Sequence, residues 1–156
     1  MQVYALELED IFEEEYALIA IHSALEDYKL AYLINKNLNT HFYKAKKNLE
    51  FVRQKEIAFF SLYTYKSLED DFSWFLIANS FSRENQALSN TFLLDSETKT
   101  FLIPELKKVD FFIKICGDVQ EQFINKTIKT IRNIDPVITA YAINKNNLKS
   151  KDFLIF

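Results

Sequence analysis

Hydrophobic residues follow two patterns along this chain, and each pattern predicts one type of element. Apolar side chains three and four positions apart predict two helices, at about residues 24–37 and 119–134. Apolar runs and alternations rich in Val, Ile, Phe and Tyr predict strands. The predicted strands cover residues 2–8, 16–21, 41–47, 56–65, 72–78, 92–94, 99–103, 109–115, 137–143 and 152–156. The pattern therefore predicts an α+β fold, in which a large, mostly antiparallel sheet carries two principal helices.

Local signals mark the ends of several elements. Ser23-Ala24-Leu25-Glu26 has the form of a capping box, which predicts that the first helix starts directly after Ser23. Asp135-Pro136 ends the second helix, because the residue before a proline is driven out of helical geometry. The polar residues 95–98 separate two short apolar runs and predict a hairpin over 92–103. The strands 16–21 and 56–65 are apolar on both faces, which is typical of strands covered on both sides.

Composition predicts one domain with an aromatic core. A chain of 156 residues can bury roughly 70% of its unfolded surface in a single core. No repeat or linker interrupts the pattern, so we expect a single domain over residues 1–156. The chain contains 15 Phe, eight Tyr and one Trp, and each buried ring removes on the order of 150–250 Å² from water.

Scarce residue types exclude several classes of site. Gly117 is the only glycine, so a phosphate-binding loop or dinucleotide fingerprint cannot be written from this sequence. Cys116 is the only cysteine, which excludes an internal disulfide and a cysteine-rich zinc site. The two histidines, His22 and His41, belong to no recognisable catalytic or zinc motif. We therefore expect a protein without cofactor, metal or catalytic activity.

Charge and hydropathy favour a cytoplasmic protein that does not enter a membrane. No basic segment followed by an apolar run opens the sequence, and no stretch approaches 18 uncharged apolar residues. The formal net charge is −3, and residues 1–28 contain eight acidic side chains and no Lys or Arg. This asymmetry either orients a partner or draws the two ends of the chain together.

One segment resembles a known family signature. Its residues are Ile103-Pro104-Glu105-Leu106-Lys107-Lys108-Val109-Asp110-Phe111. This segment resembles the motif of the IPExxxVDY family of small bacterial proteins, with Phe111 where that motif has tyrosine. Residues 21–32 and 148–154 extend the resemblance over most of the chain. The resemblance implies a bacterial origin and implies no particular biochemical activity.

The same segment has a structural interpretation of its own. Pro104 cannot donate to a sheet and restricts Ile103 to extended geometry, so it closes the preceding strand. A short turn then leads to Val109, where the next strand begins. Asp110 is expected to pair with Lys107, Lys108 or backbone amides. A fold-forming turn is favoured here over a ligand site.

His22 and Ser23 lie where a strand ends and a helix begins, a place where ligands often bind. Glu26 and Asp27 would repel an anionic ligand, so a capping role for Ser23 is favoured. An alternative hypothesis makes the protein a small-ligand binder or enzyme. In that hypothesis His22, Ser23 and Asp110 meet in one pocket as base, hydroxyl and orienting carboxylate.

Aromatic residues carry the leading functional hypothesis, a non-catalytic protein-interaction module. If two helices cannot cover both faces of the sheet, an open apolar face would bind a protein partner or form a homodimer. The candidate residues for this face are Phe42, Tyr43, Tyr63 and Tyr65. A second hypothesis is RNA binding, because Lys44, Lys46 and Lys47 follow Phe42 and Tyr43 and further basic residues lie on the second helix.

Overall fold

This computed structural model describes residues 15–53, 55–83 and 98–156. The predicted strand 2–8 and the predicted strand 92–94 lie outside the described residues. The helices are α2 (Asp27–Leu38) and α3 (Glu121–Arg132), and three 3-10 turns are η2 (Pro104–Leu106), η3 (Lys145–Asn147) and η4 (Lys151–Leu154). The strands are β1 (Tyr16–Ser23), β2 (Tyr43–Lys44), β3 (Leu49–Arg53), β4 (Glu56–Phe60), β5 (Leu62–Lys66), β6 (Ser73–Ala78), β7 (Ser80–Arg83), β8 (Thr98–Phe101), β9 (Phe111–Cys116) and β10 (Val137–Ile143).

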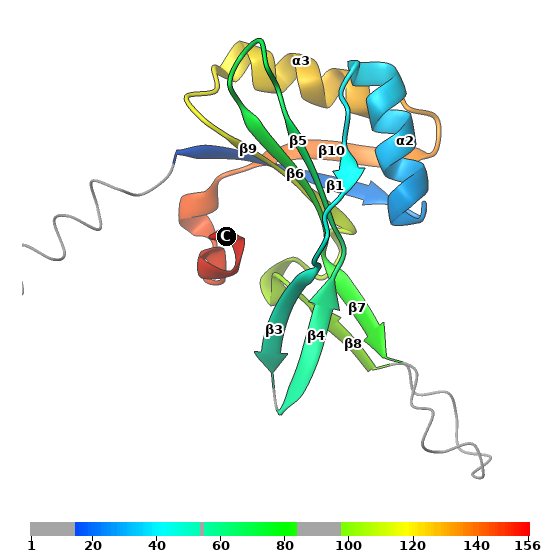
Figure 1. Ribbon diagram of the computed structural model, residues 1–156, viewed down its shortest axis with the longest axis vertical. Helices are drawn as coiled ribbons and strands as arrows, with labels where there is room; N and C mark the ends of the chain where they lie inside the picture. The colour runs from blue at the N-terminus through cyan, green and yellow to red at the C-terminus, as the bar shows by residue number, and fades with distance from the viewer. Residues whose placement is uncertain (1–14, 54, 84–97) are drawn as a thin grey trace, which may run out of the picture.

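Six of these strands form the main sheet, in the order β10-β1-β9-β6-β5-β2. Every neighbouring pair in this sheet is antiparallel. The hairpins β3–β4 and β7–β8 are separate two-stranded units that project from one end of the sheet (Figure 1). The predicted α+β fold, with a large antiparallel sheet and two principal helices, is confirmed.

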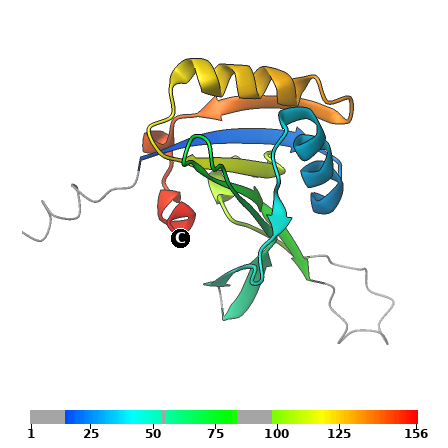
Figure 2. The ribbon, with the colours of Figure 1, turned by 45° about the horizontal axis from the view of Figure 1, so that its top comes forward.

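Each face of the main sheet carries its own buried hydrophobic cluster. On one face, α2 and α3 pack over residues such as Ile19, Trp74 and Ile113. On the other face, Leu18, Ile77 and Phe112 pack against residues of the hairpins and of the C-terminal turns. Figure 2 shows the helices on one side and the C-terminal turns on the other. Strands of the main sheet are apolar on both faces because both faces are covered. Helices cover one face, and the hairpins and C-terminal turns cover the other.

The predicted capping box is wrong. Ser23 is the last residue of β1, and the residue that precedes α2 is Glu26. The Ser23 hydroxyl accepts from the Leu25 amide at 3.2 Å and donates to the Pro136 carbonyl at 3.3 Å. The strand runs further than predicted because His22 and Ser23 pair with Thr139 and Val137 of β10, and the Asp110 carboxylate accepts a hydrogen bond from the Ser23 amide at 2.8 Å. Tertiary contacts thus replace the local cap.

Three strand predictions are also corrected. The range 41–47 contains only the two-residue strand β2, and the range 56–65 is divided into β4 and β5 at Ser61. The Ser61 carbonyl accepts from the Ala78 amide, and its hydroxyl donates to the Asp27 carboxylate, so both groups hold the chain where it changes sheets. The predicted strand 152–156 is instead formed by the last three residues of the 3-10 turn η4, Lys151–Leu154, and the two residues that follow it. The predicted hairpin strand 99–103 corresponds to β8, which pairs with β7.

Lys114 lies in the central strand β9 and is fully buried. Its ammonium donates to the Leu154 carbonyl at 2.6 Å. The same ammonium lies 4.8 Å from the ring centre of Tyr16 and 4.5 Å from that of Phe156. A carbonyl and aromatic faces stabilise a cation away from water. A charged strand residue ordinarily faces solvent. Here the C-terminal residues cover Lys114 and contact its ammonium directly.

Candidate binding site

The segment that resembles a family signature is held by one buried side chain, that of Asn79. This residue lies between β6 and β7 and is fully buried. Its Nδ2 donates to the carbonyls of Leu106 and Val109, both at 2.8 Å, and its Oδ1 accepts from the Ile103 amide at 2.9 Å. The Asn79 side chain thereby supplies partners for three backbone groups of the turn, of which the Leu106 carbonyl also accepts from the Val109 amide at 3.1 Å.

The two acidic residues of this segment bind other parts of the chain. Glu105 accepts from the Ser150 amide at 2.8 Å and from the Ser150 hydroxyl at 2.9 Å. Asp110 binds the Ser23 amide, so the prediction of a backbone-amide partner is confirmed. Of the other predicted motif residues, Pro104 is exposed at the start of η2, and the rest are buried in the core, namely Ile103, Val109 and Phe111. These contacts favour the fold-forming interpretation of the segment.

The hydrogen bonds between Glu105 and Ser150 predict a pH dependence of the stability. Burial raises the pKa of Glu105, but the hydrogen bonds from Ser150 lower it, and the net effect is a lowered pKa. A carboxyl whose pKa is lower in the folded state stabilises that state above its unfolded pKa of about 4.3, and this contribution is lost as the pH falls through the folded pKa. We expect Glu105→Gln to lower the urea midpoint at pH 7, with a difference that shrinks below about pH 4.

The control for this measurement is Glu50→Gln, which removes an exposed carboxylate on β3. Its urea midpoint should follow that of the natural protein at both pH values. A Glu105→Gln deficit of equal size at neutral and acid pH would contradict the role of the charged carboxylate.

His22 and Ser23 are neighbours at the end of β1, and Asp110 contacts Ser23. The three residues do not form a catalytic group. The His22 Nε2 lies 2.9 Å from the Tyr141 hydroxyl. The Ser23 side chain is only 2% exposed and binds the Pro136 carbonyl. Asp110 reaches the Ser23 amide and not its hydroxyl. Within the described part of the chain, no hydrogen bond joins His22 to Ser23 or Asp110, so the arrangement that a base and nucleophile require is not formed by these three.

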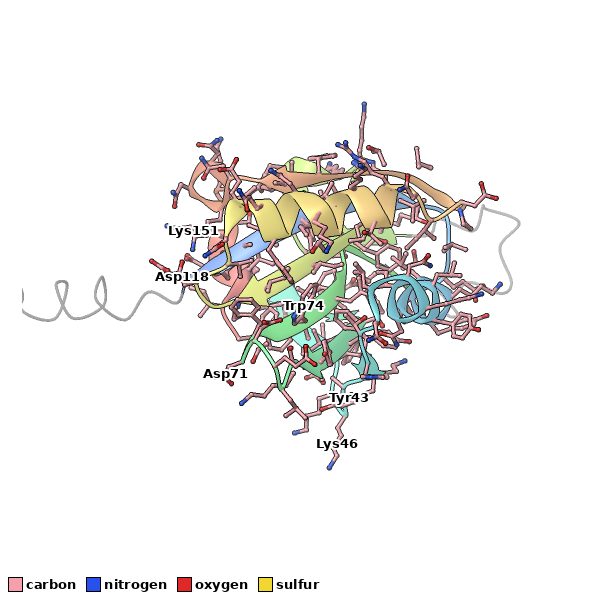
Figure 3. All side chains as sticks on the ribbon, turned by 90° about the horizontal axis from the view of Figure 1, so that it is seen from above. Tyr43, Lys46, Asp71, Trp74, Asp118 and Lys151 are labelled. Carbon is pink, nitrogen blue, oxygen red and sulfur yellow. The ribbon has the colours of Figure 1, made fainter. Side chains whose placement is uncertain are left out.

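The four aromatic residues predicted to share an open face do not form one, because their side chains differ in exposure. Phe42 and Tyr63 are buried, and Tyr65 is half-buried. Burial, followed by the charge of the nearby Asp27, raises the pKa of Tyr63. Tyr43 is 64% exposed, and Figure 3 shows it with Lys46 at the edge of the molecule. Of the four, only Tyr43 is largely exposed, and it lies near Lys46 of the RNA-binding hypothesis.

A pocket of about 320 Å³ opens on the helical side of the sheet. Its three walls are the end of α2, the β5–β6 hairpin and one side of α3. Figure 3 shows Trp74 between α3 and this hairpin, whose tip is marked by Asp71. The lining residues are Asn37, Leu38, Asn39, Thr40, Tyr65, Ser67, Glu69, Asp70, Trp74, Phe123, Lys126, Thr127 and Thr130. This volume is at the lower end of the range for small-molecule pockets, about 300–1,000 Å³.

Trp74 forms the aromatic base of this pocket. Its ring centre lies 5.8 Å from that of Phe123, 6.4 Å from that of Tyr65 and 6.1 Å from that of Phe42. The residue is only 4% exposed. Its Nε1–H is buried and has no hydrogen-bond acceptor among the described residues. Buried Trp donors usually have a partner, so this unpaired N–H, in a residue that lines the pocket, is a candidate donor to a ligand.

Four other polar side chains around the pocket donate hydrogen bonds within the protein. Thr127 donates to the Phe123 carbonyl at 2.8 Å, and Thr130 donates to the Lys126 carbonyl at 3.1 Å. Thr40 donates to the Asn35 side chain at 2.9 Å, and Asn37 donates to the Leu33 carbonyl at 2.7 Å. Hydroxyl hydrogens used in this way leave only oxygen lone pairs for a ligand.

Sequence reasoning missed both Trp74 and Asn79 as important residues. The predicted strand 72–78 included Trp74, and the only available signal was that a single tryptophan has a polar N–H that needs a partner. The pocket itself comes from three segments that are far apart in sequence. Asn79 carried no signal, because an asparagine after a strand ordinarily indicates an exposed turn.

No protein-family model, curated protein sequence or solved structure matches this chain. The resemblance to the IPExxxVDY signature therefore stays a prediction from the residues that carry it. Within the described ranges, no helix has the length and apolar character needed to cross a membrane. In the same ranges, no group of three or more His, Cys, Asp or Glu side chains is arranged to hold a metal ion.

Proposed function

We propose that this protein is a binding module that holds a small molecule in the pocket beside Trp74. The observation that carries the proposal is the buried Trp74 Nε1–H, which has no acceptor among the described residues. A donor left unpaired away from water destabilises the folded state by about 1–3 kcal/mol. A ligand acceptor that binds this donor would remove that penalty, and the ligand would gain the same free energy in affinity.

The surroundings of the donor support this proposal. Tyr65 and Phe123 add partly buried aromatic surface, and the lining also includes exposed charged residues and mostly buried hydroxyl groups. Binding sites for small molecules commonly combine an apolar lining with a few polar groups that orient the ligand.

The test is the substitution Trp74→Phe, which keeps an aromatic ring and removes the N–H. We expect the lost ring area to lower the free energy of unfolding by about 1–2 kcal/mol, partly offset by removal of the unpaired donor. In a thermal-shift screen against a library of common metabolites, the natural protein should show a ligand-dependent rise in Tm. The Trp74→Phe variant should lose that rise.

The matched control is Tyr32→Phe, which removes one polar group from an aromatic residue that is 65% exposed on α2 and outside the pocket lining. It should respond to the same compounds as the natural protein does. A screen in which every stabilising compound acts equally on the natural protein and on Trp74→Phe would overturn the proposed site.

A second candidate function is self-association through the edge strand β10, which accords with the protein-interaction hypothesis. This strand, Val137–Ile143, has no charged residue, and its Ile138 is 74% exposed. An antiparallel pair of β10 strands centred on Ala140 would set Asp135 of one copy opposite Lys145 of the other. Pairing would replace the hydrogen bond of 2.6 Å that Arg132 donates to the Ala140 carbonyl. Sedimentation at about 100 µM that shows only monomer would exclude this dimer.

A further inference from the structure

The charged side chains around the Trp74 pocket divide by sign between two walls. Glu69 and Asp70 belong to the loop of the β5–β6 hairpin, and Lys126 belongs to α3. In the described part of the chain, none of these three takes part in an ion pair, whereas Lys66 pairs with Asp71 outside the pocket lining. A ligand between the walls would thus meet two carboxylates on one side and one ammonium on the other.

The uncharged groups restrict the ligand further. The hydroxyls of Thr127 and Thr130 donate within α3 and offer a ligand only their lone pairs. These oxygens and the two carboxylates are hydrogen-bond acceptors, so they would bind donor groups of the ligand. The Trp74 Nε1–H and the Lys126 ammonium are donors, so they would bind acceptor groups of the ligand.

Apolar surface completes the pocket. The rings of Tyr65 and Phe123 and the side chain of Leu38 line it together with Trp74. Aromatic and aliphatic groups of a ligand bind such a lining by removal from water. The complete requirement is a small molecule with a cationic donor, an anionic acceptor and an apolar group.

Resting on the function proposed above, we propose that the ligand is a zwitterion of the amino-acid class with an apolar side chain. Its ammonium faces Glu69 and Asp70, and its carboxylate is bound by Lys126 and the Trp74 Nε1–H. Its side chain packs against the aromatic rings. A phosphate-bearing ligand is disfavoured, because the two carboxylates would repel a dianion that has one lysine to bind it. A neutral sugar has no charge to pair with Lys126 or with the two carboxylates.

Trp74 is the only tryptophan of the chain, so its fluorescence reports directly on the pocket. The probes are L-leucine, L-methionine and L-phenylalanine, each compared with its N-acetyl form and its carboxamide form. We expect saturable emission changes with the free amino acids. Either derivative should bind about ten- to a hundredfold more weakly, because each loses one charge-assisted contact. Glucose and inorganic phosphate complete the panel and should cause no change.

Variants of the charged lining residues test which wall binds the carboxylate of the ligand and which binds its ammonium. Lys126→Met should weaken the binding of the free amino acids about tenfold or more. It should also reduce the preference of the protein for free amino acids over their carboxamides. Glu69→Gln combined with Asp70→Asn should reduce the preference over the N-acetyl forms in the same way. Lys129→Met is the control, since Lys129 is exposed on α3 and lies outside the pocket lining.

The outcomes separate this inference from the function on which it rests. Saturable binding of glucose, phosphate or an N-acetyl derivative in preference to the free amino acids would overturn the zwitterionic class. Such binding would still support the pocket if the Trp74→Phe variant loses it in calorimetry. Free amino acids that bind equally well to the natural protein, Lys126→Met and the double carboxylate variant would also overturn the class. No response to any free amino acid would do the same, and the Trp74→Phe screen would then decide the function separately.

Discussion

Asn79→Ala is expected to lower the free energy of unfolding by about 3–6 kcal/mol, the largest effect of any single substitution considered for this protein. The alanine leaves the Ile103 amide and the carbonyls of Leu106 and Val109 without the side-chain partners that Asn79 provides. Each buried polar group left unpaired costs about 1–3 kcal/mol. A shift of the urea midpoint with an unchanged slope would measure the effect as a loss of stability.

Two further variants make the reason testable. Asn125→Ala removes an exposed asparagine from α3 and should change stability by less than about 0.5 kcal/mol. Asn79→Asp keeps an acceptor for the Ile103 amide but sets a carboxylate oxygen against two carbonyls, so it should be at least as harmful as alanine at pH 7. An Asn79→Asp variant of natural stability would show that donation to Leu106 and Val109 contributes little.

Gly117→Ala should destabilise the protein by roughly 2–5 kcal/mol, through backbone strain and overpacking together. Gly117 follows β9 with a φ of 134°, a conformation that L residues rarely adopt. A Cβ atom there would lie 2.5 Å from Cδ1 of the Phe72 ring. That ring packs against Phe123, with 5.9 Å between ring centres, so it has limited freedom to move. Thermal unfolding of the variant measures the combined effect.

The Phe72→Ala background separates the two contributions. With the ring removed, the Gly117→Ala substitution should lose its steric part and keep its backbone part of about 1–3 kcal/mol. Ala substitution at the neighbouring Asp118 is the control for a local loop effect. If Gly117→Ala is neutral in the natural protein, the chain relaxes around this position and the backbone conformation is not required.

Local sequence signals predicted elements well and predicted their ends less well. The spacing of Ile128 and Ile131 indicated the second helix, and both residues are buried on the inner side of α3. The capping box at Ser23 failed because pairing with β10 continues β1 to Ser23, whose amide donates to Asp110, distant in sequence. The strand predicted over 56–65 was divided because Ser61 contacts Asp27 and Ala78 at the point where the chain passes between two sheets. In each case a long-range hydrogen bond decided the boundary.

Long-range packing also decided which polar residues are buried. The alternation in β9 placed Lys114 on the same face as Phe112, but gave no reason to expect a buried ammonium. The C-terminal residues cover that face and provide the Leu154 carbonyl and the Phe156 ring. Asn79 is buried for a comparable reason, since the turn after β8 folds over it. Such burial depends on segments that local patterns cannot bring together.

The sequence by itself determined the fold class, because hydrophobic periodicity depends only on neighbouring residues and on the geometry of helices and strands. It also determined that glycine-rich phosphate loops and internal disulfides are excluded, since the residues they require are lacking. Only the tertiary structure decided where the candidate site lies. Trp74 comes from β6, Lys126 from α3 and Glu69 from the β5–β6 loop. Their meeting depends on strand order and helix packing, which arise from contacts between distant segments and leave no periodic signal in the chain.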